Sequence, residues 1–238
     1  MKIRAILLLL TASTALLWSS CDKMGCPYEE GCDLVIDTSE TDTTRLTWSH
    51  TNRSPENIMM RNILIEEFTG HTCKECPEGA VEIERLAADH SPQVIAVAIH
   101  AGGFADPVGG IFTTDYRTEA GEDYLQFFNV EWYPSGMISR IGDGTTKMLG
   151  RDQWAPIVTG HITDLPPARI DLTNFYNDTT RYLRSQVSVE WLADMSANEY
   201  KLQLYCIEDS LVSPQLDDDS TRYDYVHRHN SAALEQLR

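Results

Sequence analysis

Two cysteines separated by two residues are the side chains in this sequence with the clearest capacity for chemistry. Cys73 and Cys76 enclose Lys74 and Glu75, and they follow an apolar run at residues 63–65 and a Thr-Gly turn. A strand that leads through a turn to a Cys-x-x-C at the start of a helix is typical of proteins that exchange thiols and disulfides. The pattern therefore predicts a redox dithiol.

The elements that position this dithiol can be predicted from hydrophobic periodicity. The run at residues 63–65 is typical of a buried strand in a parallel sheet. Small or apolar residues then recur at helical spacing: Ala80, Ile83, Leu86 and Ala87. They predict a helix with the cysteines at its amino end, where partial positive charge lowers the pKa of a thiol. Pro77 cannot donate a hydrogen bond to the Cys73 carbonyl, so the first turn is expected to be loosened or to begin later.

The following segments predict a β-α-β unit with a helical insertion. Residues 94–99 form a second apolar run, typical of the neighbouring parallel strand. Two glycine pairs bound residues 104–108, which we expect to form a mobile loop. No Gly-Lys-Ser or Gly-Lys-Thr follows, so a phosphate-binding loop is not predicted. A helix capped by Thr114 or Asp115 and running towards Phe128 completes the insertion.

A proline-containing strand and another helix come next. Tyr133-Pro134 is a candidate cis peptide bond, and residues 136–141 are predicted to form a strand after it. One apolar helix face is then predicted from five residues: Trp154, Ile157, Val158, His161 and Ile162. His161 is expected to be a satisfied core histidine. His71 is expected to be a solvated turn residue; the alternative is that it adds a positive charge near Cys73.

Beyond Leu165 the hydrophobic pattern changes to a period of two. The runs at residues 186–191 and 200–207 are separated by polar turns, which predicts an antiparallel β domain. Cys206 lies in one of these runs and is expected to be a buried free thiol. About seventy residues are few for a complete sandwich, so we expect a truncated, sandwich-like domain.

The charge of the chain excludes one class of partner. With 19 Lys and Arg against 36 Asp and Glu, the net charge is −17 and the pI is about 4.7. A phosphate backbone would be repelled over most of such a surface. No nucleic-acid binding is predicted.

The amino terminus has the pattern of an export signal. Lys2 and Arg4 precede an apolar run at residues 5–17, which is too short to span a bilayer but suits a signal peptide. Two serines then precede Cys21, which resembles the processing site of a bacterial lipoprotein. That resemblance implies lipid attachment at Cys21 and a membrane anchor. The alternative is an ordinary secretory signal with a chance cysteine.

An acidic segment follows the signal and contains two further cysteines. We interpret residues 21–57 as a tether in which Cys26 and Cys32 form a disulfide. The alternative is a four-thiolate metal site that adds Cys73 and Cys76. Its first pair is poorly spaced for zinc, so neither a metal nor a cofactor is predicted.

The region at about residues 62–163 resembles the thioredoxin fold. In that family a buried carboxylate lies six residues before the first cysteine, where this sequence has Glu67, and a cis-proline faces the dithiol, where it has Pro134. The family's tryptophan before the first cysteine is replaced by Thr72, and its Gly-Pro between the cysteines by Lys74 and Glu75. These differences leave the redox potential and the direction of electron flow open.

Two other segments, IEEFTGHTCKECPEG and YDYVHRHN, resemble the twenty-eight-kilodalton outer-membrane protein family of Bacteroidetes. That resemblance implies a lipoprotein of the cell envelope, located at the outer membrane. Four segments are predicted: a lipoprotein signal peptide at 1–20, an acidic tether at 21–57, a thioredoxin-like α/β domain at 58–165 and a β-rich C-terminal domain at 166–238.

The predicted function is thiol-disulfide exchange on envelope or extracellular proteins. Cys73 would attack as a thiolate, Cys76 would resolve the mixed disulfide, Glu67 would carry a proton to or from Cys76, and Pro134 would present backbone to the substrate. The alternative is a non-catalytic surface lipoprotein for binding or adhesion, in which the cysteine pair is inert or structural.

Overall fold

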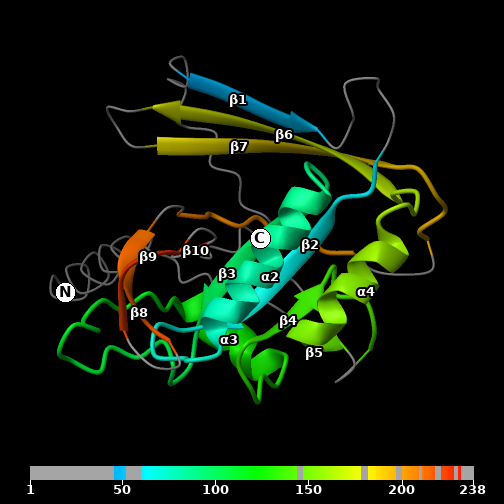
Figure 1. Cartoon of the computed structure of the whole chain (residues 1–238). Helices are drawn as coiled ribbons and strands as arrows, with labels where there is room; N and C mark the ends of the chain where they lie inside the picture. Colours follow the sequence, from blue (N-terminus) through cyan, green and yellow to red (C-terminus); the bar gives the residue numbers. More distant parts are fainter. Residues whose placement is uncertain are drawn as a thin grey trace, which may run out of the picture.

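The apolar run that precedes the dithiol forms the central strand of a mixed sheet. The computed structural model describes residues 60–143, 147–177, 182–196, 200–208 and 211–217, and it gives only the strand pairing of 46–51, 221–227 and 230–231. Strand β2 (Ile63–Thr69) pairs in parallel with β3 (Val94–His100) and antiparallel with β4 (Ser135–Ile138). The structure is α/β, with this mixed sheet and a second, antiparallel one (Figure 1).

Short strands complete the mixed sheet on both sides. β5 (Leu149–Gly150) pairs antiparallel with β4, and β10 (Asn230–Ser231) pairs in parallel with β3. The strand order is therefore β10-β3-β2-β4-β5. A strand from the C-terminal part of the chain thus belongs to the same sheet as the strand that leads to the dithiol.

Helices cover both faces of the mixed sheet because β2 and β3 are apolar on both sides. α2 (Cys76–Asp89) and α4 (Arg151–His161) lie side by side over one face (Figure 1). Their core contains Ile65 of β2, Leu86 of α2 and Trp154 of α4, all almost fully buried. α3 (Glu119–Phe127) packs on the opposite face through Tyr124, against Phe68 of β2.

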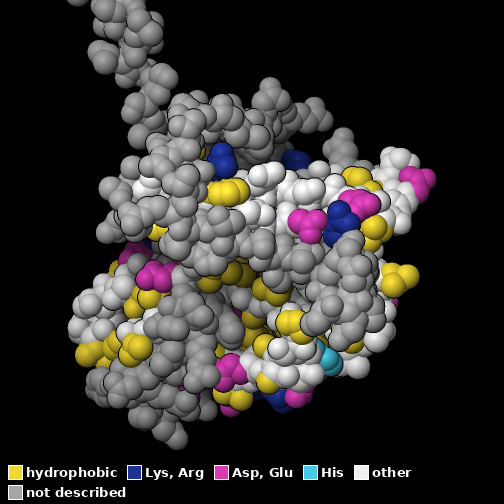
Figure 2. Space-filling view, turned by 90° about the horizontal axis from the view of Figure 1, so that it is seen from above, with side chains coloured by type: hydrophobic (Ala, Val, Ile, Leu, Met, Phe, Trp, Pro, Cys, Tyr) yellow, Lys and Arg dark blue, Asp and Glu magenta, His cyan; other side chains and the backbone are white. Residues whose placement is uncertain are grey.

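A second sheet contains three antiparallel strands in the order β1-β6-β7. They are β1 (Leu46–Thr51), β6 (Ala168–Asn177) and β7 (Tyr182–Trp191). Large apolar side chains are exposed on it: Ile170, Leu183, Val189 and Trp191. Figure 2 looks down on the side where Figure 1 draws these strands, and it shows hydrophobic side chains lying among charged ones. A third sheet pairs β8 (Leu211–Leu216) with β9 (Thr221–His227).

α2 begins at Cys76, with Pro77 in its first turn, where a missing N–H costs least, so the later start indicated by Pro77 is confirmed. Two other element boundaries differ from the predictions for physical reasons. α3 begins at Glu119 and is capped by the Thr118 side chain, so the predicted caps at Thr114 and Asp115 were wrong. β4 ends at Ile138 instead of residue 141, because Ser139 and Arg140 adopt positive φ angles of 47° and 51°.

Two predictions about the C-terminal part were also wrong. Residues 200–207 form no strand apart from a single bridge at Cys206, and the thiol of Cys206 is exposed. The residues of this segment that turn inwards are Gln203 and Tyr205, which bond to Tyr124 and Glu66, whereas the apolar Tyr200 and Leu202 are exposed. The face of the segment that packs on the mixed sheet is therefore not the one that the apolar-polar period predicted.

His161 is not a core histidine. It is the last residue of α4, and its half-buried ring lies 2.8 Å from the Asp164 carboxylate. Trp154 and Val158 from the same predicted face are buried, as expected.

The predictions for the signal peptide, lipid attachment at Cys21 and the Cys26–Cys32 disulfide concern positions outside the described residues. Within the described part of the chain, no helix is long and apolar enough to cross a membrane.

Candidate redox site

Cys73 and Cys76 form a disulfide at the junction of β2 and α2. Cys76 is the first residue of α2, whereas Cys73 lies in the preceding turn, closed by a bond from its N–H to the Gly70 carbonyl oxygen at 3.1 Å. The cysteine side chains are only 2% and 3% exposed. The predicted pair is therefore brought together, but its sulfurs are largely covered.

The turn before the dithiol is held against the predicted insertion, which lies between the second apolar run and the Tyr-Pro strand at about residues 100–129. Thr72 donates two hydrogen bonds to the carbonyl oxygen of Phe104, from its N–H at 3.0 Å and its hydroxyl at 2.8 Å. Gly70 makes this approach possible, because a Cβ there would lie 2.3 Å from the Phe104 carbonyl carbon. The insertion thus fixes one side of the dithiol turn.

The two adjacent carboxylates of β2 fall on opposite faces of the sheet, as alternation along a strand requires. Glu66 faces α3 and is fully buried, where Arg140 forms two hydrogen bonds to it and the Tyr205 hydroxyl a third. Glu67 faces α2, and its Oε1 has no hydrogen-bond partner among the described residues. Of these two carboxylates, Glu67 is therefore the one that has no compensating cation among the described residues.

Burial raises the pKa of Glu67 to about 8 from an ordinary value of 4.5. The cause is desolvation, which penalises the charged form of a carboxyl that is only 3% exposed. At neutral pH the group is mostly protonated. It can then give a proton to a neighbouring group or, at slightly higher pH, accept one.

Glu67 meets the first turns of α2 at Gly79. A Cβ on Gly79 would lie 2.6 Å from Glu67 Oε1 and 3.0 Å from the Cβ of Pro134. Gly79 is three residues after Cys76, and residues three apart lie on the same helix face. The predicted acid and proline thus lie on the face of α2 that carries Cys76. The sequence analysis missed Gly79, although a glycine in the first turns of a helix was an available signal.

Pro134 follows a cis peptide bond to Tyr133, as predicted. Both residues line a cavity of about 310 Å³ with Glu75, which precedes Cys76. The same cavity is bounded by Arg151 and Asp152 at the start of α4. An opening therefore lies beside the dithiol, between Pro134 and the amino ends of α2 and α4.

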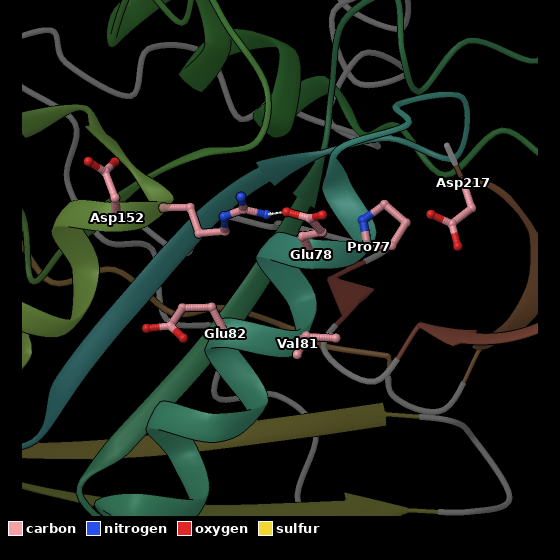
Figure 3. A pocket seen from close by; sticks show the side chains of 7 residues that line it. Pro77, Glu78, Val81, Glu82, Asp152 and Asp217 are labelled. Carbon is pink, nitrogen blue, oxygen red and sulfur yellow. Dashed lines mark hydrogen bonds and ion pairs between the residues drawn. The ribbon is translucent and has the colours of Figure 1, made fainter. Parts of the chain in front are cut away.

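A larger cavity of about 520 Å³ continues along α2 from Pro77 (Figure 3). Carboxylates predominate in its lining: Glu78, Glu82, Asp152 and Asp217. Arg151 is paired across the cavity with Glu78. The surface beside the dithiol is thus acidic and carries a cation that is already paired.

The C-terminal part of the chain covers the other side of the dithiol turn. The amide of Gln215 donates hydrogen bonds to the carbonyl oxygens of Cys73 at 2.9 Å and Gly70 at 3.2 Å. The same amide nitrogen also bonds to the carbonyl oxygen of Leu216. The N–H of Leu216 donates to the His71 carbonyl oxygen at 2.8 Å. No signal in the sequence indicated Gln215, which is 142 residues from Cys73.

His71 is buried in this turn, so its prediction as a solvated residue was wrong. Its side chain is 1% exposed, and Nε2 donates to the Asp106 carbonyl oxygen at 2.9 Å. The rings of Phe112 and Tyr116 contact it. The insertion therefore supplies both a hydrogen-bond acceptor and an aromatic environment.

The described residues contain no cluster of three or more histidine, cysteine or acidic side chains placed to hold a metal ion. The alternative four-thiolate site also needed Cys26 and Cys32, which lie outside the described residues. In this structure Cys73 and Cys76 bind each other.

Comparison with known proteins gives little further information. No family model matches the sequence, and no curated protein matches it. Among solved structures, the chain is similar to a structural-genomics protein of Agrobacterium tumefaciens, with 11% sequence identity and a TM-score of 0.31. The match covers 54% of this chain and 72% of that one. A likeness at this level carries no argument about the fold or the function.

Proposed function

We propose that the protein exchanges thiols and disulfides with other proteins through Cys73 and Cys76, on a thioredoxin-like domain. The succession of β2, α2 and β3, with the cysteine pair at the start of α2, supports this proposal. The position of Pro134 immediately before β4 and beside Gly79 supports it as well. A substrate would approach through the opening that Glu75 and Pro134 line.

The observation that carries the proposal is the buried, unpartnered Glu67 behind α2. Burying a carboxyl whose Oε1 has no hydrogen-bond partner costs folding free energy. A purely structural disulfide does not need a buried carboxyl beside it. Exchange has such a need, because Cys76 must lose a proton to attack and gain one after leaving. The raised pKa of Glu67, at about 8, lies close enough to neutral pH for both steps.

In the reducing direction, the Cys73 thiolate attacks one sulfur of a substrate disulfide, and the other substrate sulfur leaves as a thiolate. Ionised Glu67 then takes the proton of Cys76, whose sulfur attacks Cys73. The Cys73–Cys76 bond forms, the second substrate sulfur leaves, and two electrons have passed to the substrate. A partner dithiol returns the pair to the reduced state. The oxidising direction is the reverse, with protonated Glu67 giving its proton to Cys76.

The reduction of insulin disulfides by dithiothreitol tests this proposal. We expect the wild-type chain to accelerate the reaction and Cys73→Ser to abolish the acceleration. Glu67→Gln keeps the shape of the side chain but cannot exchange the proton, so the rate should fall about tenfold or more. If the wild-type chain and Cys73→Ser give equal rates in both directions of exchange, the proposal is wrong.

A second candidate is favoured by the burial of the disulfide. With exposed fractions of 2% and 3%, the two cysteines are as covered as a structural crosslink would be. In this alternative the protein is a non-catalytic surface module for binding or adhesion. Equal insulin reduction by the wild-type chain and Cys73→Ser, together with a lower melting temperature of Cys73→Ser, would favour it.

We also propose that the protein is an envelope lipoprotein of the outer membrane, anchored through Cys21, and that its substrates are envelope or extracellular proteins. The apolar run after Lys2 and Arg4 and the position of Cys21 at its end support this. Mass spectrometry of the protein from membranes should find the acyl chains on the Cys21 peptide. Cys21→Ser should then appear in the soluble fraction, and its retention in membranes would contradict the proposal.

A further inference from the structure

Strand β8 lies over the dithiol turn and holds it by hydrogen bonds. Gln215 is 2% exposed, and its amide bonds to the carbonyl oxygens of Gly70 and Cys73. Leu216 adds a bond from its N–H to the His71 carbonyl oxygen. Asp217, which follows Leu216, lines the larger cavity together with Pro77 at the start of α2 (Figure 3). We refer to residues 213–217 as the β8 cover.

Strand β8, to which most of the β8 cover belongs, has the reverse of the usual strand pattern. Its two buried side chains, Ser213 and Gln215, are polar, whereas Val212 is 63% exposed. A strand that packs permanently on a protein core normally buries its apolar side chains and exposes its polar ones. The attachment of this strand to the dithiol turn therefore depends on the hydrogen bonds of Gln215 and Leu216 more than on apolar contact.

Disulfide exchange requires an attacking sulfur to approach one sulfur of the pair along the axis of the bond. A Cys73 side chain that is 2% exposed gives no such approach. Gln215 is itself buried and bonds directly to the Cys73 carbonyl oxygen, so loss of that contact would free this side of the turn. Hydrogen bonds to backbone oxygens can also be replaced by those of an incoming extended peptide.

We propose that Gln215 is a positioning residue that keeps the β8 cover closed over the Cys73–Cys76 disulfide, and that the cover must open before a thiol can react. The proposal rests on the redox function argued above. A substrate segment that bonds to the Gly70 and Cys73 carbonyl oxygens would displace the Gln215 amide. The cover would thereby restrict exchange to partners that bind this turn.

The rate of chemical reduction of the disulfide tests this mechanism without any protein substrate. Dithiothreitol would be added to the folded chain, and the free thiols of Cys73 and Cys76 would be followed by alkylation and mass spectrometry of their peptide. In this reaction two electrons and two protons pass from the reagent to the cysteine pair, and the reagent closes its own disulfide. Gln215→Ala removes two hydrogen bonds to the turn, so we expect reduction to be roughly 5–30-fold faster.

Two further variants separate opening of the cover from loss of folding. Gln203→Ala is the matched control, because Gln203 lies in the same part of the chain but bonds to Tyr124 on the opposite face of the sheet. It should leave the reduction rate unchanged. Gln215→Glu keeps the size of the side chain but places acceptor oxygens against the two carbonyl oxygens, and it should accelerate reduction while the circular dichroism spectrum stays native.

The outcomes separate this proposal from the redox function. Equal rates of disulfide reduction by dithiothreitol in the wild-type chain, Gln215→Ala and Gln215→Glu would overturn the proposal that the β8 cover protects the disulfide, even if the protein reduces insulin. Faster chemical reduction in both Gln215 variants supports the cover, even if neither variant reduces insulin, and in that case the proposed redox function is the one that fails. Acceleration by Gln203→Ala as large as that by Gln215→Ala would also overturn it, because the effect would then be one of general destabilisation.

Discussion

Replacing Gly79 with alanine should destabilise the protein, although the same change within most helices is stabilising. The gain from alanine in α2 is roughly 0.5–1 kcal/mol. The new methyl group would lie 2.6 Å from Glu67 Oε1 and 3.0 Å from Pro134 Cβ, so neighbouring atoms must move. Overpacking of this kind costs about 1–3 kcal/mol. We therefore expect a net loss of about 1–2 kcal/mol.

Urea and thermal unfolding would measure this loss. A change of 1 kcal/mol corresponds to roughly 2–4 °C for a chain of this size, so the melting temperature should fall by about 2–8 °C. Gly160→Ala in α4 is the matched control, since a Cβ there has no atom within 4 Å. It should raise the free energy of unfolding by up to about 1 kcal/mol.

A double-mutant cycle assigns the loss to Glu67. In a Glu67→Ala background the carboxylate that Gly79→Ala would contact is absent, so the cost of the alanine should shrink by about 1 kcal/mol or more. The reasoning is refuted if Gly79→Ala is as stabilising as Gly160→Ala, or if its effect is the same with and without the Glu67 side chain.

Three further predictions concern charged side chains. The pKa of Glu67 is about 8 in the folded chain and near 4.5 in the unfolded chain. The free energy of unfolding of the wild-type chain should therefore fall by up to about 5 kcal/mol as the pH rises between these values. Glu67→Gln should show a flatter dependence on pH in urea unfolding from about pH 4 to 9. Arg140→Ala leaves Glu66 buried without its cation and should cost about 3 kcal/mol in the same assay. Arg85→Ala removes only exposed pairs and should leave the melting temperature unchanged; an equal loss in both arginine variants would contradict the distinction.

The local elements around the dithiol could be predicted because their signals are local. Uniformly apolar runs predicted β2 and β3, and the spacing after the cysteines predicted α2. Pro77 correctly indicated a later start of that helix. The position of Glu67 before the cysteines predicted a buried carboxyl there, which the structure has, although the lack of a hydrogen-bond partner for its Oε1 could be seen only in three dimensions.

The rest depended on contacts between distant residues. Gln215 is an ordinary polar residue in sequence, and only tertiary packing brings it to the Cys73 carbonyl oxygen. The alternation at residues 200–207 has the period of a strand, but the segment is held by Tyr205, which bonds to Glu66, while the apolar Tyr200 and Leu202 are exposed. Burial of His71 likewise required the insertion to fold back over the turn. Period and composition do not encode which surface a segment meets.

Trapping of a mixed disulfide tests the central claim most directly. Without Cys76, a bond between Cys73 and a substrate sulfur cannot be resolved, so Cys76→Ser should accumulate a covalent complex with a substrate protein. The exposed Cys206 would be replaced by serine in all variants to prevent its reaction. Incubation with a disulfide-containing protein, in chains with and without Gln215→Ala, would be followed by mass spectrometry of the crosslinked peptides. The account predicts a Cys73-to-substrate link in Cys76→Ser that is absent from Cys73→Ser; no such link, even with Gln215→Ala, would contradict it.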